Sequence, residues 1–143
     1  MPMSKAPSMQ PSVLYRSWLS RHERGGTATD LLLDTDVLVE HLRGARRLQP
    51  ASGRIAYSAI TRCELFAGAN RREAIVHSLL EPLTEIVVDR AIAETAGRLR
   101  RRRGTHMADA LIAATAIQHG LTLVTRNLKG YRGIPGLKVD APR

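Results

Sequence analysis

Three acidic residues of this 143-residue chain lie in or beside strongly apolar segments. Asp34 directly follows a run of three leucines, and Asp109 lies near the start of the alanine-rich stretch HMADALIAATAIQHG. Glu64 is spaced to share a helix face with Ile60 and Ala67. Burying a carboxylate costs free energy unless a partner compensates its charge. Because carboxylate oxygens are hard ligands, the three residues predict a site for Mg²⁺ or Mn²⁺.

Each of these acids also has a purely structural explanation. Asp34 could cap a short helix that starts near Val37. Glu64 stands three residues after Thr61, the spacing of a helix capping box. Asp109 lies on the first turn of its helix, where a negative charge is favoured by the helix dipole. The metal-site hypothesis therefore depends on the three carboxylates meeting at one place.

Three further polar residues are expected near the same place. Thr125 and Asn127 follow a predicted strand over residues 121–125, so Thr125 can direct its hydroxyl toward Asp34. Asn127 could instead build a turn. Asp36 is either an extra ligand or a helix cap. These residues are possible supporting groups rather than primary ligands.

Two other kinds of site fit the sequence less well. The five histidines show no ligand-like spacing and Cys63 is the single cysteine, which disfavours zinc. The stretch LLLDTDVL is similar to the nucleophile motif of haloacid-dehalogenase-type phosphatases. That chemistry needs a lysine and then an acidic pair downstream, and after Thr125 the one acid is Asp140. The phosphatase interpretation therefore lacks essential residues.

The charge of the chain points to a polyanionic partner. Lys and Arg number 22 against 13 Asp and Glu, a formal net charge of +9. Nucleic acid is the leading candidate, although a basic surface can also serve solubility alone. A divalent metal on a basic protein suggests hydrolysis of a phosphodiester bond. A dense basic cluster, interpreted either as a solvated helix end or as a contact surface, comprises Arg100, Arg101, Arg102 and Arg103.

Hydropathy patterns alternate between strands and helices from residue 30 onward. Strands are predicted at 31–33, 54–57, 86–88, 121–125 and 137–139. Helices are predicted at 37–42, from Ser58 or Thr61 to 70, and at 71–81, 89–103 and 106–119. This alternation predicts an α/β fold with a parallel sheet between helical layers. In such folds ligands bind beyond the carboxyl ends of the strands, where Asp34 is expected.

Residues 1–29 differ from the rest and are interpreted as a loosely ordered extension or a short helix, followed by one domain over residues 30–143. No apolar stretch is long enough to span a bilayer, and the first residues lack the apolar core of a secretory signal. With a single cysteine, no internal disulfide can form. A cytoplasmic location and no membrane association are therefore expected.

Four stretches resemble a known family in both order and spacing. They are LLLDTDVLVEHL, YSAITRCELFAG, ADALIAATAIQHGLTLVTRN and GYRGIPGLKV, and together they span nearly everything after the extension. They are similar to the VapC-type toxins of the PIN-domain ribonucleases. The resemblance implies a three-layer α/β/α sandwich with a mostly parallel sheet and an Mg²⁺- or Mn²⁺-dependent endoribonuclease. It also implies a homodimer that a cognate VapB-type antitoxin neutralises in a hetero-oligomer.

The resemblance assigns expected roles to individual residues. Asp34, Glu64 and Asp109 match the catalytic acidic triad, with Asp34 and Asp109 as direct metal ligands and Glu64 acting through water. Asn127 falls where many members carry a fourth acid, and Thr125 matches a hydroxyl that supports the first aspartate. Independently of the resemblance, the charge of the arginines at 100–103 and their closeness to Asp109 in sequence make them possible contacts for RNA or the antitoxin. The alternative is a catalytically inactive PIN-like module that binds RNA or protein.

Overall fold

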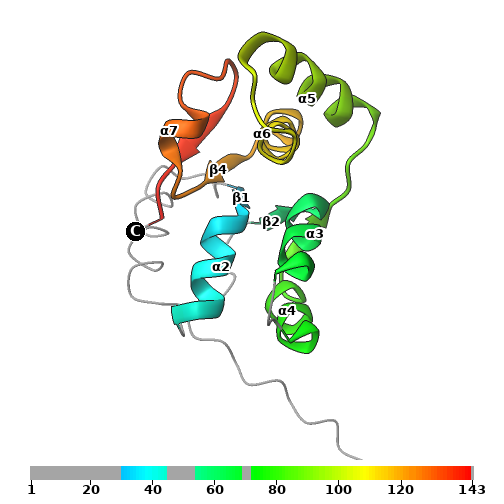
Figure 1. The fold of residues 1–143 in the computed structure, drawn as a ribbon, viewed down its shortest axis with the longest axis vertical. Coiled ribbons are helices and arrows are strands. Elements are labelled where there is room, and N and C mark those ends of the chain that lie inside the picture. The colour runs from blue at the N-terminus through cyan, green and yellow to red at the C-terminus, as the bar shows by residue number, and fades with distance from the viewer. Residues whose placement is uncertain (1–29, 45–53, 69–71, 143) are drawn as a thin grey trace, which may run out of the picture.

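The computed structural model describes residues 30–44, 54–68 and 72–142, and the predicted extension at 1–29 lies outside these ranges (Figure 1). Strands and helices alternate along the described chain. The strands are β1 (Leu31–Leu33), β2 (Ile55–Ser58), β3 (Thr84–Ile86), β4 (Thr122–Val124) and β5 (Lys138–Asp140). The helices are α2 (Thr35–Gly44), α3 (Ala59–Ala67), α4 (Glu73–Leu80), α5 (Arg90–Arg103), α6 (Met107–His119) and α7 (Leu128–Tyr131).

The five strands form one parallel sheet in the order β3-β2-β1-β4-β5. The predicted α/β fold with a parallel sheet is confirmed. Strand β1 is central, because Leu31 pairs with Ile55 of β2 on one side and with Thr122 of β4 on the other. The strand order changes direction between β1 and β4, which is where ligand crevices form in open α/β sheets. This topology places the residues after β1 and β4 at the expected binding edge.

Each face of the sheet has its own apolar core. Successive strand residues point to opposite faces, so Leu31 and Leu33 belong to one cluster and Leu32 to the other. The first cluster contains residues of α2, α3 and α4, and the second contains residues of α5 and α6. These two groups of helices lie on opposite sides of the strands (Figure 1). The leucines before Asp34 are all 1% exposed or less, so they anchor β1 from both faces.

Helix α6 has an alanine-rich sequence that lets it pack closely. Its Ala110, Ala113, Ala114 and Ala116 are at most 1% exposed, and its closest helical neighbour is α5. The helix leads directly into β4 and therefore runs antiparallel to the strands. Its first turn, which carries Asp109, consequently lies at the carboxyl edge of the sheet.

The positions of some elements differ from the sequence-based predictions. Strand β3 begins at Thr84 and not at Ile86, and Val87, predicted to lie in the strand, is 65% exposed. As an edge strand with exposed Thr84 and Glu85, β3 gives no clear hydropathy signal. The single-turn helix α7 was not predicted. No helix within the described ranges is both long and apolar enough to cross a membrane.

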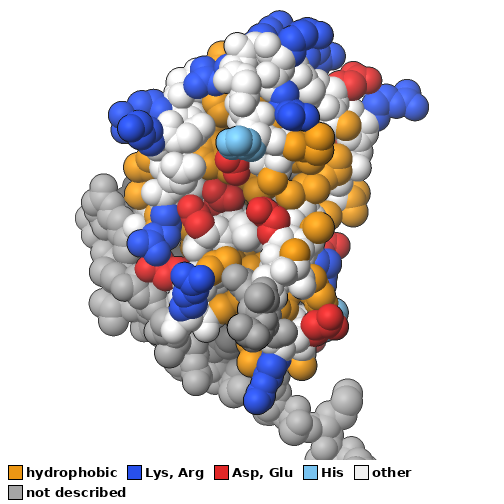
Figure 2. All heavy atoms as spheres, in the orientation of Figure 1, with side chains coloured by type: hydrophobic (Ala, Val, Ile, Leu, Met, Phe, Trp, Pro, Cys, Tyr) orange, Lys and Arg blue, Asp and Glu red, His pale blue; other side chains and the backbone are white. Residues whose placement is uncertain are grey.

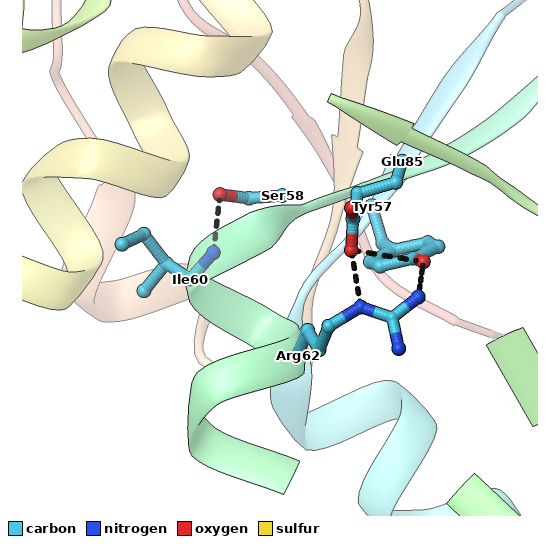
Figure 3. Close-up of polar contacts among 5 residues, drawn as sticks. All are labelled: Tyr57, Ser58, Ile60, Arg62 and Glu85. Atoms are coloured by element: carbon cyan, nitrogen blue, oxygen red, sulfur yellow. Dashed lines mark hydrogen bonds and ion pairs between the residues drawn. The ribbon is translucent and has the colours of Figure 1, made fainter. Parts of the chain in front are cut away.

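The start of α3 shows which of two predicted caps forms. The Ser58 hydroxyl accepts a hydrogen bond from the Ile60 backbone N–H at 3.1 Å (Figure 3). The capping box of Thr61 and Glu64 is therefore wrong, because α3 starts before Thr61. This leaves both Thr61 and Glu64 within the helix, with their side chains available for tertiary contacts.

A cluster of polar side chains joins α3 to strands β2 and β3. The Tyr57 hydroxyl donates to Glu85 Oε1 at 3.2 Å and accepts from Arg62 Nη2 at 2.8 Å. Arg62 also donates through Nε to Glu85 (Figure 3). Strands β2 and β3 and helix α3 are thereby joined by side chains as well as by the backbone ladder.

Candidate active site

A cavity of about 420 Å³ opens at the carboxyl edge of the sheet. Five acids line it: Asp34, Asp36, Glu40, Glu64 and Asp109. They come from the end of β1 and from α2, α3 and α6. Figure 2 shows acidic side chains gathered in a central hollow of this face. The three primary residues predicted from sequence thus share one cavity wall, although they are far apart in the chain.

Asp34 is the most deeply placed of these carboxylates. It is 6% exposed, and its backbone N–H donates to the Val124 carbonyl at 2.9 Å. Asp34 Oδ1 accepts from the Thr35 N–H at 2.8 Å, and Oδ2 accepts from the Thr125 hydroxyl at 2.8 Å. The predicted support from Thr125 is therefore present in the structure. Two donors, one from the end of each central strand, fix the orientation of this side chain.

The surroundings of Asp34 disfavour its negative charge. Burial, followed by the nearby Asp36 carboxylate, raises the pKa of Asp34 from 3.8 to about 6. Burial also raises the pKa of Asp36. Two carboxylates therefore stand together in a partly desolvated place, where the negative charge of each is unfavourable. A bound cation would compensate this charge.

Asp36 bridges the segments that follow β1 and β4. Its two carboxylate oxygens accept from the Arg126 N–H at 3.3 and 3.2 Å, and the Thr125 hydroxyl lies 3.4 Å from Oδ2. The carboxylate therefore holds the chain after β4. This contact adds to the two roles predicted from sequence, and the extra-ligand role of Asp36, which lines the cavity, stays a prediction.

Glu64 is held by Thr35, a residue for which the sequence predicts no role. The Thr35 hydroxyl donates to Glu64 Oε1 at 2.7 Å and also lies 3.0 Å from the buried Thr61 hydroxyl. The expectation that Glu64 faces an apolar interior is wrong, because the residue is exposed toward the cavity. The position of Thr35 between Asp34 and Asp36 is the one feature of the sequence that could have indicated its place at the site.

Asp109 is held by Tyr131, a second residue for which the sequence predicts no role. The Tyr131 hydroxyl donates to Asp109 Oδ1 at 3.1 Å, and Tyr131 is only 1% exposed. Burial, with Asp34 and Asp109 close by, raises the pKa of Tyr131 far above its usual range. The phenol is therefore protonated and acts as a donor. Asp109 is half-buried, so this contact fixes a carboxylate that still reaches the cavity.

Asn127 forms the turn that was its structural alternative. Its side-chain oxygen accepts from the Gly130 N–H at 3.2 Å and caps α7. Its own backbone N–H donates to the Thr125 hydroxyl at 3.0 Å. Asn127 also lines the cavity. A supporting role at the metal site stays a prediction.

The donor set of the cavity fits a hard divalent cation. Within residues 30–44, 54–68 and 72–142, no group of three or more His, Cys, Asp or Glu side chains is arranged to hold one ion directly. Thr35 holds Glu64 and Tyr131 holds Asp109, and the carboxylates repel one another. An ion that keeps several waters needs only one or two direct carboxylate ligands, as Mg²⁺ commonly does. The cavity has room for such an ion with its waters.

Comparison with known proteins agrees with this geometry. The family model described as PIN domain matches residues 31–133. The chain belongs to the PIN-domain family. It is 35% identical to Ribonuclease VapC19 of Mycobacterium tuberculosis, over 75% of this chain and 96% of that protein. It is 31% identical to the tRNA(fMet)-specific endonuclease VapC of Salmonella typhimurium, over 76% and 95%.

A solved structure extends the likeness from sequence to fold. A chain of a toxin–antitoxin complex from Klebsiella pneumoniae is 34% identical, with a TM-score of 0.68. The match covers 80% of this chain and 98% of that one. The resemblance to VapC-type PIN domains and the three-layer α/β/α prediction are confirmed.

The arginine cluster of this PIN domain divides into two pairs. Arg100 donates to the Thr105 carbonyl at 3.3 Å, and Arg103 donates to the carbonyls of Gly133 and Arg132 at 3.1 and 2.9 Å. Arg101 and Arg102 are exposed and make no hydrogen bond or ion pair with the described part of the chain. The first pair stabilises local backbone, and the second pair is available to a partner.

Proposed function

We propose that this PIN-domain protein is a VapC-type toxin, an endoribonuclease that hydrolyses RNA and is neutralised by a cognate VapB-type antitoxin. The observation that carries the proposal is the set of carboxylates from three distant segments on one cavity wall, with buried Asp34 at its base. Relatives named as ribonucleases and a toxin–antitoxin complex support it. A homodimer and a cytoplasmic location stay predictions.

The proposed site would use Mg²⁺ or Mn²⁺, which Asp34 and Asp109 would hold directly, and Glu64 would act through water. When bound, such an ion lowers the pKa of a water molecule and neutralises charge on the leaving oxygen. Glu64 has Oε1 held by Thr35, which leaves Oε2 to accept a proton from the attacking water. Arg43 and Arg126 line the same cavity, and Arg126 is paired through Nη1 with Glu40 at 3.0 Å. Arg43 would bind the phosphate, joined by Arg126 if the phosphate replaces Glu40 as its partner.

Cleavage of RNA by the purified full chain tests the proposal. Incubation with a mixed RNA substrate and Mg²⁺ is expected to yield defined fragments. EDTA should stop the reaction, restored Mg²⁺ or Mn²⁺ should restart it, and Asp34→Asn should be inactive. Binding of RNA without cleavage under all metal conditions would instead support the inactive binding module.

Replacing Arg101 and Arg102 together with serine is expected to weaken RNA binding and leave folding unchanged. Each lost phosphate contact reduces the slope of log affinity against log salt by about 0.7 for single strands, so two contacts give about 1.4. Binding measured across a salt series checks this. The matched control replaces two other exposed arginines, Arg72 and Arg90, with serine. An equal slope in both double variants would contradict the assignment.

Deletion of residues 1–29 is expected to leave folding and cleavage unchanged. The described residues of the sheet, of both apolar cores and of the cavity all follow residue 29 in the chain. Circular dichroism melting and the cleavage rate of the shortened chain check this expectation. A shortened protein that cannot fold would show that the extension is part of the domain.

A further inference from the structure

We propose that Tyr131 is a positioning residue for the divalent ion, because its hydroxyl fixes the Asp109 carboxylate with one oxygen directed to the ion. The inference rests on the proposed function, since it concerns the same site. Tyr131 reaches Asp109 across 22 residues of sequence from the end of the short helix α7. Its hydroxyl also interacts with the Asp34 carboxylate. One phenol therefore lies beside both expected direct ligands.

The position of Tyr131 is fixed from several sides. Its ring belongs to the core cluster shared with α5 and α6. Its carbonyl accepts from the Ile134 N–H at 3.4 Å. The Arg103 guanidinium donates to the carbonyls of the next two residues, Arg132 and Gly133. The hydroxyl is therefore presented by a rigid support and not by a free side chain.

Donation from Tyr131 leaves Asp109 with a single free oxygen. Among the described residues, the Tyr131 hydroxyl provides the one hydrogen bond to the Asp109 side chain, and it goes to Oδ1. Oδ2 then remains for an ion, which favours coordination through one oxygen. Outer hydrogen bonds of this kind orient metal ligands, and their loss usually lowers metal affinity. Without the hydroxyl, the half-buried carboxylate could rotate away from the ion.

A second buried tyrosine, Tyr57, provides a control that distinguishes positioning of a metal ligand from the general effect of losing a buried hydrogen bond. Tyr57 is also 1% exposed, and its hydroxyl is bonded to Glu85 and Arg62 (Figure 3). That cluster does not line the cavity. Both tyrosines bury a bonded phenol, but only Tyr131 is bonded to an expected metal ligand. Tyr57→Phe is therefore a matched control for Tyr131→Phe.

Calorimetric titration of Mn²⁺ into the full chain tests the proposal. Tyr131→Phe is expected to weaken Mn²⁺ binding about 10-fold, and Tyr57→Phe is expected to bind as the wild type does. In cleavage assays Tyr131→Phe should need more Mn²⁺ for half-maximal rate, with the KM for RNA unchanged. Wild-type Mn²⁺ affinity in Tyr131→Phe would overturn the proposal. A wild-type protein that binds no Mn²⁺ would overturn the metal site itself, a different and recognisable result.

If Tyr131→Phe does not fold, a spectroscopic measurement that leaves Tyr131 in place tests the same proposal. In the Tyr57→Phe protein, Tyr131 is the one buried tyrosine within the described ranges. Addition of Mg²⁺ to this variant should perturb the ultraviolet absorption of tyrosine, because an ion at Asp109 changes the charge beside the phenol. No perturbation at saturating Mg²⁺ would overturn the proposal.

Discussion

Asp109→Asn is expected to lower the rate of RNA cleavage by about 1,000-fold or more, the scale of loss when a catalytic electrostatic group is removed. The substitution keeps the size of the side chain, and the asparagine oxygen can still accept from the Tyr131 hydroxyl. What disappears is the negative charge that would hold the ion. Single-turnover cleavage at saturating Mg²⁺ measures the effect, and melting curves check that the fold persists.

A matched control for Asp109→Asn is available in the preceding helix. Asp89 caps α5 by accepting from the Ile92 N–H at 2.9 Å and does not line the cavity. Asparagine caps helices about as well as aspartate. Asp89→Asn removes the same charge elsewhere and is expected to leave cleavage unchanged. Wild-type cleavage by Asp109→Asn, or an equal loss in both variants, would contradict the assigned role of Asp109.

Asp34→Asn is expected to stabilise the metal-free protein at neutral pH while abolishing cleavage. Burial raises the pKa of Asp34 from 3.8 to about 6, so ionisation of this group opposes folding at pH 7. A shift of this size corresponds to about 3 kcal/mol at most in the free energy of unfolding. Asparagine removes the charge and can still accept from the Thr35 N–H. Urea unfolding in EDTA measures the gain.

The pH dependence of this gain has a definite sign. Below the unfolded pKa of Asp34 both states carry the proton, so Asp34→Asn and wild type should be equally stable. As pH rises from about 4 to about 6, the unfolded state loses its proton before the folded state does, and wild-type stability falls. The advantage of Asp34→Asn should therefore grow over this window and be constant above it. A variant less stable than wild type at pH 7 would show that the lost Thr125 contact dominates.

Bound Mg²⁺ should reverse the order of stability between the two proteins. An ion that binds the folded wild type adds to its stability by mass action. The asparagine variant lacks the charge needed to hold the ion and should gain little. Repeating the unfolding measurement at rising Mg²⁺ concentration therefore separates relief of charge from loss of metal binding.

The sequence was most informative where a pattern is local. Three consecutive leucines followed by Asp34 predict a strand that is buried on both faces, and β1 is buried in this way. The alanines around Asp109 predict a closely packed helix, as α6 is. The prediction placed edge strand β3 too late in the sequence. The strand buries only one of its residues, so the hydropathy pattern favoured a strand over the apolar residues that follow it.

Contacts between distant segments were predicted only in part, because the hydrogen bond of Thr125 to Asp34 was expected but other contacts at the site were not. Thr35 meets Glu64 across 29 residues, and Tyr131 meets Asp109 across 22 residues. Nothing in the local pattern of GYRGIPG distinguishes a buried tyrosine that donates to a carboxylate from an ordinary turn residue. The same applies to Arg103, which looks like its neighbours in sequence but holds the loop after α7. Such pairings depend on the order of strands in the sheet.

A crystal structure of the protein soaked in Mn²⁺, with anomalous scattering recorded near the manganese edge, is the most direct test of the proposed site. We expect a peak in the cavity at the carboxyl edge of the sheet, within about 2.5 Å of carboxylate oxygens of Asp34 and Asp109. Water should bridge the ion to Glu64. A cavity without a peak at a Mn²⁺ concentration that supports cleavage, or an ion bound elsewhere, would contradict the proposed site.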